Sequence, residues 1–204
     1  MTPELIEDGR AFPLLAWRFA GEVTAASTAA VGGGLGERRW VINAQVAKDY
    51  RRHDLAAHGA ELAALAGLSG AGVVMFTAAD VRAVRSAAEH GVRADATVGV
   101  TLPTWAAAAD DPVAVPAPGT INVVVQLPVR LTASALLNAL CTATEAKSQA
   151  LFEAGVPGTG TASDAVTVVC PVAGPAEEFA GPRSVWGARL ARAVHAAVRD
   201  GVRP

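Results

Sequence analysis

Two hydrophobic periodicities alternate along this chain, and they limit its possible folds more than any other feature. Runs in which every second residue is apolar indicate strands, whereas apolar residues recurring every three or four positions indicate amphipathic helices. WVINAQV at 40–46 and TINVVVQL at 120–127 are of the first kind, and 133–153 is the longest stretch of the second. Strands and helices interspersed in this way indicate a sheet covered by helices.

The connections between these elements indicate what kind of sheet to expect. Ala20-Gly21 separates two strand-like runs and reads as a hairpin, and 103–118 joins one strand to another, so a purely parallel sheet is disfavoured. We predict an α/β (or α+β) fold, a single domain over 1–204 with a mixed β-sheet covered by helices. The expected strands lie at 13–20, 22–31, 40–46, 70–76, 93–102, 120–127 and 165–170, and the expected helices at 54–65, after Thr77 to about 90, at 133–153 and at 183–199.

Composition and charge restrict the partners of the chain. About half of the 204 residues are hydrophobic, which is enough for a substantial core, and the formal net charge is -2. Neither nucleic acid nor a membrane surface is therefore an expected partner. The acidic first residues do not resemble a secretory signal, and no apolar stretch is long enough to span a bilayer. We expect a cytoplasmic protein.

The sequence has no cofactor or metal motif of the usual spacing. The glycines of GGGLGERR at 32–39 precede a strand, so the helix N-terminus that binds phosphate is missing. No pair among the four histidines has zinc-site spacing. Cys141 and Cys170 are expected to be small, reduced core residues. We expect no cofactor, and the need for a metal stays open.

The segment GVPGTGTASDAVTVVC at 155–170 is unusual because hydroxyls and small residues alternate before an apolar run. If this segment is extended, its period of two places the hydroxyls on one side and leaves the other side nearly bare. It is either a binding loop or the entry to a strand. The hydroxyls belong to Thr159, Thr161 and Ser163, and the residues between them are Gly158, Gly160 and Ala162.

The helix expected at 133–153 carries a lysine in an unusual place. Lys147 falls within the apolar arc of that helix, whereas Glu145 falls on the opposite face. A buried lysine is unfavourable unless it forms an ion pair or extends its amine to the edge of the core. The amine either lies at that edge or is held in a cleft, where Asp164 is the nearest acidic candidate.

Neutral polar side chains share faces on two of the expected strands. Thr120 and Asn122 lie on one side of TINVVVQL, and Asn43 and Gln45 lie on one side of WVINAQV. These faces are either exposed or converge on a cleft. Such a cleft has many neutral hydrogen-bonding groups and few charges, which suits a large ligand rich in amides better than a phosphate.

Several motifs in combination resemble the adenosylcobinamide amidohydrolase family of cobalamin salvage. They are GTINVVVQL, the run LLNALCTATEAKSQALFEAGVPGTGTASDAVTVV, AGPRSVWGARLARAV, GGGLGERRWVINAQVAKDY and GLSGAGVVMFTAADV, which together cover nearly the whole chain. The resemblance implies hydrolysis of the amide that joins aminopropanol to the corrinoid, giving adenosylcobyric acid. The corrinoid is then the substrate and not a cofactor. A homodimer is one of the assemblies left open.

The chemistry of amide hydrolysis, and not the resemblance, suggests a role for each residue. Backbone N–H groups at Gly158 and Gly160 are the first choice for stabilising the oxyanion. A hydroxyl is the nucleophile, or a carboxylate activates water directly. The candidate nucleophiles are Ser163, Thr161 and Thr159, and the candidate bases are Asp164 and Glu145. Lys147 either lowers the pKa of a hydroxyl or holds the carboxylate. Thr120, Asn122 and Asn43 are expected to bind substrate.

Two further readings stay open from the sequence. A corrinoid carrier would use the same amide-matching site without chemistry, and an amidase or acyltransferase of another small molecule would not bind corrinoid. We also expect one tryptophan, Trp17, Trp40 or Trp105, near the macrocycle.

Overall fold

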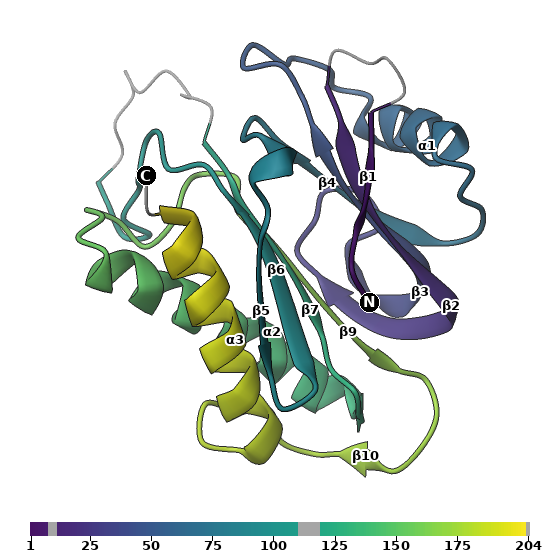
Figure 1. Cartoon of the computed structure of the whole chain (residues 1–204), viewed down its shortest axis with the longest axis vertical. Coiled ribbons are helices and arrows are strands. Elements are labelled where there is room, and N and C mark those ends of the chain that lie inside the picture. The colour runs from purple at the N-terminus through teal and green to yellow at the C-terminus, as the bar shows by residue number, and fades with distance from the viewer. Residues whose placement is uncertain (8–11, 110–118, 203–204) are drawn as a thin grey trace.

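The computed structural model describes residues 1–7, 12–109 and 119–202 (Figure 1). In these residues eight strands form one sheet, in the order β4-β3-β2-β9-β7-β6-β5, with β1 paired to β2. The elements are β1 (Glu4–Ile6), β2 (Leu14–Ser27), β3 (Gly34–Gln45), α1 (Leu55–Leu65), β4 (Gly72–Thr77), η1 (Val81–Ala83), β5 (Arg85–Glu89), β6 (Val92–Val98), β7 (Ile121–Gln126), β8 (Arg130–Leu131), α2 (Ala133–Glu153), β9 (Ala165–Pro171), β10 (Ala176–Glu177) and α3 (Val185–Val202).

The sheet is mixed, as predicted. Neighbouring strands are parallel at β3–β4 and β7–β9, where α1 and α2 provide the crossovers. The pairs β2–β3, β2–β9, β6–β7 and β5–β6 are antiparallel. The predicted class, an α/β fold with a mixed sheet covered by helices, is therefore confirmed.

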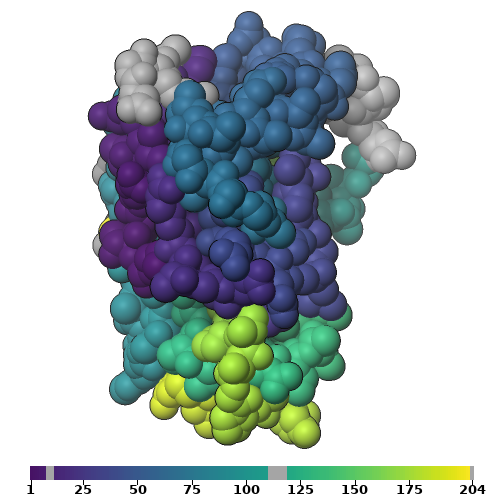
Figure 2. Space-filling model, turned by 90° about the vertical axis from the view of Figure 1, so that its right-hand side faces the viewer, coloured from purple at the N-terminus to yellow at the C-terminus, as the bar shows by residue number. Residues whose placement is uncertain are grey.

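Helices cover different parts of the sheet. α2 and α3 pack against β6, β7 and β9, whereas α1 packs against β2, β3 and β4 (Figure 1). Successive residues of a strand point to opposite faces, so every second residue of these strands lies on the face away from the helices. Figure 2 shows the side of the molecule where the N-terminal strands and the α1 region lie above C-terminal segments.

Strong curvature of the sheet brings non-adjacent strands together. The Asn122 side chain on β7 donates a 3.1 Å hydrogen bond to the Phe76 carbonyl on β4, although three strands separate β4 from β7 in the sheet. The concave face therefore encloses a second core of its own, which includes Trp17, Val41 and Val124. Polar side chains at one end of this enclosed face contribute to the candidate site.

The predicted hairpin at Ala20-Gly21 is wrong, because β2 runs without a break through these residues. Both halves of β2 pair antiparallel with β3, with a register shift between Arg18 and Val23. The extra residues form an irregularity that bends the strand instead of reversing it. A turn-forming pair of residues therefore bends a strand instead of reversing it where the neighbouring strand continues alongside.

The predicted helix after Thr77 is also wrong. Its place is taken by the short 3₁₀ helix η1, capped by Asp80, and by β5. β5 pairs with β6 through a turn at His90 and Gly91, both of which have positive φ. The alanine-rich β5 has helical propensity, but pairing with β6 decides its conformation.

The helices predicted at 133–153 and 183–199 are confirmed as α2 and α3. The Thr132 hydroxyl accepts a hydrogen bond from the Ala135 N–H and caps α2, and Gly155 follows its end with a φ of +76°. Cys170 is buried as expected, but Cys141 is exposed on α2. Within the described residues, no helix is long and apolar enough to cross a bilayer. Residues 110–118 of the predicted long connection lie outside the described residues.

Candidate active site

The loop between α2 and β9 passes beside the segment that contains Thr104. The Thr104 N–H donates to the Gly160 carbonyl at 2.8 Å, and the Thr159 N–H donates to the Thr104 carbonyl at 2.9 Å. A turn follows at 162–163, so the loop is not extended throughout. The condition under which its three hydroxyls would share one side is therefore not met, and they have different partners.

Asp164 forms the centre of this loop. Its Oδ2 accepts hydrogen bonds from the Lys147 ammonium and from the Thr161 N–H. Its Oδ1 accepts from the Ile121 N–H at 2.9 Å and from the Thr161 hydroxyl at 2.5 Å. Four donors occupy the four lone-pair positions of this carboxylate. Asp164 thereby joins α2, β7 and the loop.

Lys147 is buried, with 5% of its surface exposed, and its ammonium forms an ion pair with Asp164. Of the two arrangements left open by the sequence, the structure thus has the paired one. Its partner is the carboxylate expected from the sequence. Glu145, the other candidate base, is exposed on α2, away from this pair.

The two glycines of the loop leave room for its own neighbours. A Cβ at position 160 would overlap the Lys147 ammonium and the Asp164 carboxylate, and one at 158 would come within 2.8 Å of the Thr104 nitrogen. The N–H groups of Gly158, Thr159 and Thr161 all donate within the protein. These glycines therefore allow close packing around the ion pair. The Gly158 N–H donates to the Val156 carbonyl, whereas an oxyanion role for the Gly160 N–H stays a prediction.

The other two hydroxyls of the loop have neutral partners. The Ser163 hydroxyl lies 2.8 Å from that of the buried Thr120 and 3.3 Å from the Gly119 carbonyl. The Thr159 hydroxyl binds the backbone of Thr104 and Ala106. Thr161 is thus the loop residue whose hydroxyl contacts a carboxylate.

A buried polar chain lies beside the start of β9. Asn122 donates to the Asn43 side chain at 2.8 Å, and Asn43 donates to the Thr97 hydroxyl at 2.8 Å. Asn122 is adjacent to Ala165 in the sheet, and its Oδ1 is buried without a hydrogen-bond partner among the described residues. The two strand faces therefore meet, but Asn43 and Asn122 are buried and line neither cavity described below, so their binding of substrate stays a prediction.

A cavity of about 520 Å³ opens beside the loop. Ser163 and Asp164 line one wall, and Tyr50, Arg52 and Phe76 line another. The sequence interpretation missed these last three residues, because no local pattern places them opposite the loop. The remaining lining residues are Thr28, Ala29, Ala30, Leu55, Met75, Ala162 and Ala165.

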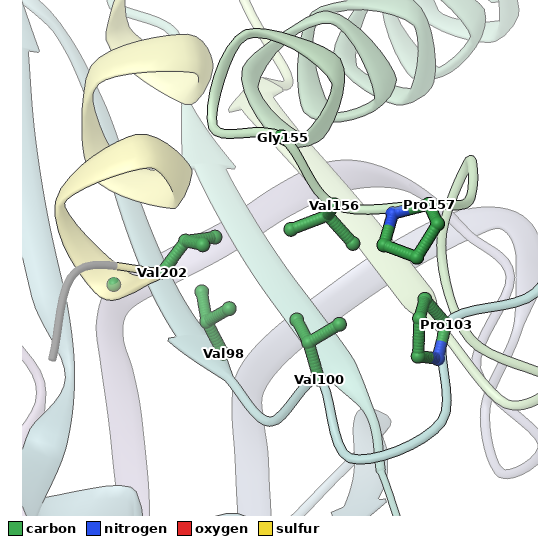
Figure 3. A pocket seen from close by; sticks show the side chains of 8 residues that line it. Val98, Val100, Pro103, Gly155, Val156, Pro157 and Val202 are labelled. Carbon is green, nitrogen blue, oxygen red and sulfur yellow. The ribbon is translucent and has the colours of Figure 1, made fainter.

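A second cavity, of about 470 Å³, lies on another side of the loop (Figure 3). Val98, Val100, Pro103, Val156, Pro157 and Val202 surround it, together with Gly155 and Gly201. None of these lining side chains is an acid, a base or a nucleophile, so the first cavity is the candidate active site.

The three tryptophans expected near the macrocycle differ in exposure. Trp17 is 1% exposed and its Nε1 donates to Asp95, and Trp40 is 7% exposed. Trp105 is 52% exposed and follows Thr104, which binds the loop. In residues 1–7, 12–109 and 119–202, no three His, Cys, Asp or Glu side chains gather as a metal site.

The protein thus has a single mixed sheet, and beside a cavity at that sheet a hydroxyl, a carboxylate and an ammonium are linked to one another. A sequence model of the adenosylcobinamide amidohydrolases matches residues 2–204, so the chain belongs to that family. The resemblance noted from the sequence is thereby confirmed.

A curated relative supports the same assignment. The adenosylcobinamide amidohydrolase of Methanosarcina mazei (strain ATCC BAA-159 / DSM 3647 / Goe1 / Go1 / JCM 11833 / OCM 88) is 37% identical over 93 residues. That segment covers 41% of this chain and 46% of the relative, so the match spans about half of the relative's length.

Proposed function

We propose that this protein hydrolyses the aminopropanol amide of adenosylcobinamide to give adenosylcobyric acid. The observation that carries the proposal is the 2.5 Å hydrogen bond from the Thr161 hydroxyl to Asp164, beside a cavity in a chain of this family. A nucleophile within hydrogen-bonding distance of a base, and a third group holding that base, is the usual arrangement of covalent catalysis.

In this mechanism Thr161 is the nucleophile and Asp164 receives its proton. Lys147 holds the carboxylate in place from the side of α2 and acts through Asp164. The alternative nucleophile, Ser163, contacts Thr120 and Gly119 and has no carboxylate partner in the described structure. Its hydroxyl instead suits the role of oxyanion donor, because Thr120 can donate to Ser163 while the Ser163 proton turns from the Gly119 carbonyl to the substrate.

The dimensions of the cavity fit part of the substrate. A volume of about 520 Å³ is within the usual range for small ligands but too small for a corrin ring with its side chains. The aminopropanol arm enters the cavity, and the macrocycle stays at its mouth. The apolar lining residues and the hydroxyls of Thr28 and Ser163 suit a neutral amide arm.

The direct test is to incubate purified protein with adenosylcobinamide and measure release of aminopropanol together with a corrinoid carboxylate. Thr161→Val should lower turnover by about 10³-fold or more, and Ser163→Ala by about 10²-fold. Thr144→Val, on the exposed face of α2, is the matched control and should keep full turnover. If the native protein bound adenosylcobinamide but released no amine, its function would be that of a corrinoid carrier and not of an amidase. The converse result, nearly full turnover of Thr161→Val, would assign the attack to water or to Ser163.

A further inference from the structure

Three aromatic rings stack beside the cavity, opposite the loop. The Tyr50 ring lies 5.5 Å from that of His58 on α1 and 5.7 Å from that of Phe76 on β4, and the last two are 5.3 Å apart. The Tyr50 hydroxyl is 2.6 Å from Nδ1 of His58. The stack and this hydrogen bond hold the phenol in a defined position.

Tyr50 separates His58 from the candidate active site. Tyr50 and Phe76 line the cavity that also contains Ser163 and Asp164. Tyr50 and His58 line a neighbouring cavity of about 300 Å³. The phenol therefore stands between the substrate cavity and an imidazole behind it.

Amide hydrolysis needs a proton for the departing amine, because an amide ion is too basic to leave. Two charged side chains line the cavity, and both are engaged. Asp164 accepts four hydrogen bonds, and Arg52 is bound to Asp54 and Glu61. Burial raises the pKa of the Tyr50 phenol, so the phenol keeps its proton at neutral pH.

We propose that Tyr50 donates the proton to the leaving amine and that His58 is the positioning residue that resupplies it through Nδ1. This inference rests on the proposed amidase function and adds a catalytic residue from outside the loop. Its basis is the phenol on the wall facing the loop and the 2.6 Å contact with an imidazole behind it.

The proton balance of the step is complete. The C–N bond of the tetrahedral intermediate breaks, its electron pair stays on nitrogen, and the nitrogen takes the Tyr50 proton. Before the step, the Nδ1–H of His58 donates a hydrogen bond to the phenol oxygen. After the step, the phenolate oxygen takes that proton from His58. When water hydrolyses the acyl intermediate, Asp164 returns to the Thr161 oxygen the proton that it took from Thr161, and the attacking water gives one proton to the Tyr50–His58 pair. The overall change is amide plus water to carboxylic acid plus amine.

Charges around the pair affect its titration. Arg52, Asp54 and Glu61 surround Tyr50, and Asp54 and Glu61 also interact with His58. Any shift measured in the pH profile must therefore be compared in variants that keep these three residues.

Tyr50 is the only tyrosine of the chain, which makes a clean experiment available. Fluorotyrosine incorporated during expression changes this phenol alone and lowers its pKa with each added fluorine. The alkaline limb of turnover against pH should move to lower pH in the same order. A phenol with a merely structural role would leave that limb in place.

Substitutions give a second readout. Tyr50→Phe should lower turnover of adenosylcobinamide by about 10²-fold, the usual scale for loss of a general acid. On a p-nitrophenyl ester of adenosylcobyric acid, whose leaving group needs no proton, the same variant should lose less than about threefold. His58→Gln should retain part of the activity and alter the pH profile. The control is His195→Gln, since His195 lies on α3 and contacts Glu153 instead.

The outcomes separate this inference from the proposed function. Native protein that releases no aminopropanol overturns both. Native protein that is active, with Tyr50→Phe equally active or equally impaired on amide and ester, overturns only the role of Tyr50. A loss confined to the amide, together with a fluorine-dependent alkaline limb, supports it.

Discussion

Asp164 shows how one side chain can link distant parts of the chain at residue scale. It accepts hydrogen bonds from α2, from the start of β7 and from its own loop. Both partners of the ion pair are nearly buried, with side-chain exposures of 6% for Lys147 and 10% for Asp164. A buried pair of this kind stabilises the fold only while it is complete, because removing one partner leaves a buried charge.

We predict that Lys147→Met lowers the free energy of unfolding by about 3 kcal/mol, at the low end for a broken buried pair because Asp164 keeps three other donors. Turnover should fall as well, since the carboxylate loses the group that holds it. Chemical denaturation measures the first effect and aminopropanol release the second. Adding Asp164→Asn should cost less stability in the Lys147→Met background than in the native protein. Additive losses would show that the two side chains do not interact.

Gly160 provides a second test at this scale. We predict that Gly160→Ala destabilises the protein and lowers turnover together, because the new Cβ must displace Lys147 or Asp164. Overpacking of this kind usually costs about 1–3 kcal/mol. Gly21→Ala is the matched control, since no atom lies within 4 Å of a Cβ there. Equal melting temperatures for the two variants would contradict the close packing at position 160.

At the scale of elements, α2 places Lys147 beside the loop, and the two ends of α2 fix the position of the helix. Thr132 caps its first turn, and Gly155 allows the chain to turn toward the loop. The loop in turn binds the Thr104 segment on one side and β7 on the other. The site is therefore built where a helix, a loop and a strand end meet.

We predict that Thr132→Ala lowers the free energy of unfolding by about 1 kcal/mol, the usual effect of losing an N-cap hydroxyl. Turnover of the folded protein should change little, because the cap is at the opposite end of α2 from Lys147. Thr144→Ala, at an exposed site within the same helix, should change stability by less than about 0.5 kcal/mol. Urea unfolding of the three proteins gives the comparison. If both variants lost the same stability, the capping hydrogen bond would not be the cause.

At the scale of the whole molecule, curvature of the sheet assembles the cavity. β4 and β7 approach each other across the concave face, which places Tyr50 and Phe76 opposite the loop that precedes β9. Tyr50 is more than a hundred residues from Asp164 in the sequence, and Phe76 is more than eighty residues from it. The cavity thus depends on the integrity of the entire sheet.

A nearly neutral molecule whose two charged cavity residues, Arg52 and Asp164, form ion pairs within the protein should bind a neutral ligand with little dependence on salt. We predict that affinity for adenosylcobinamide changes less than about twofold between low and physiological ionic strength, because few ion pairs form on binding. Quenching of tryptophan fluorescence by the corrinoid reports the binding. Trp105→Phe should remove most of the quenching, since Trp105 is the exposed tryptophan beside the Thr104 segment. A steep decrease of affinity with salt would contradict this prediction.

Local patterns were sufficient for the parts of the fold where periodicity and end signals agree. The period of two predicted β6, β7 and β9, and the Thr132 cap with Gly155 predicted α2. Lys147 in an apolar arc, followed by Asp164, was enough to name their pairing as one of two possible arrangements of the amine. Each of these features depends on neighbours close in sequence, where side-chain direction follows from the backbone alone.

Tertiary structure decided what depends on distant partners. β3 continues beside both halves of β2, so Ala20-Gly21 became a bend, and β6 drew the alanine-rich β5 into the sheet. The turn at 162–163 separated hydroxyls that an extended chain would align. The rings of Tyr50, His58 and Phe76 stack only because the tertiary fold brings the Tyr50 segment and α1 against β4. Strand pairing and curvature are set by contacts far apart in sequence, and no local pattern contains them.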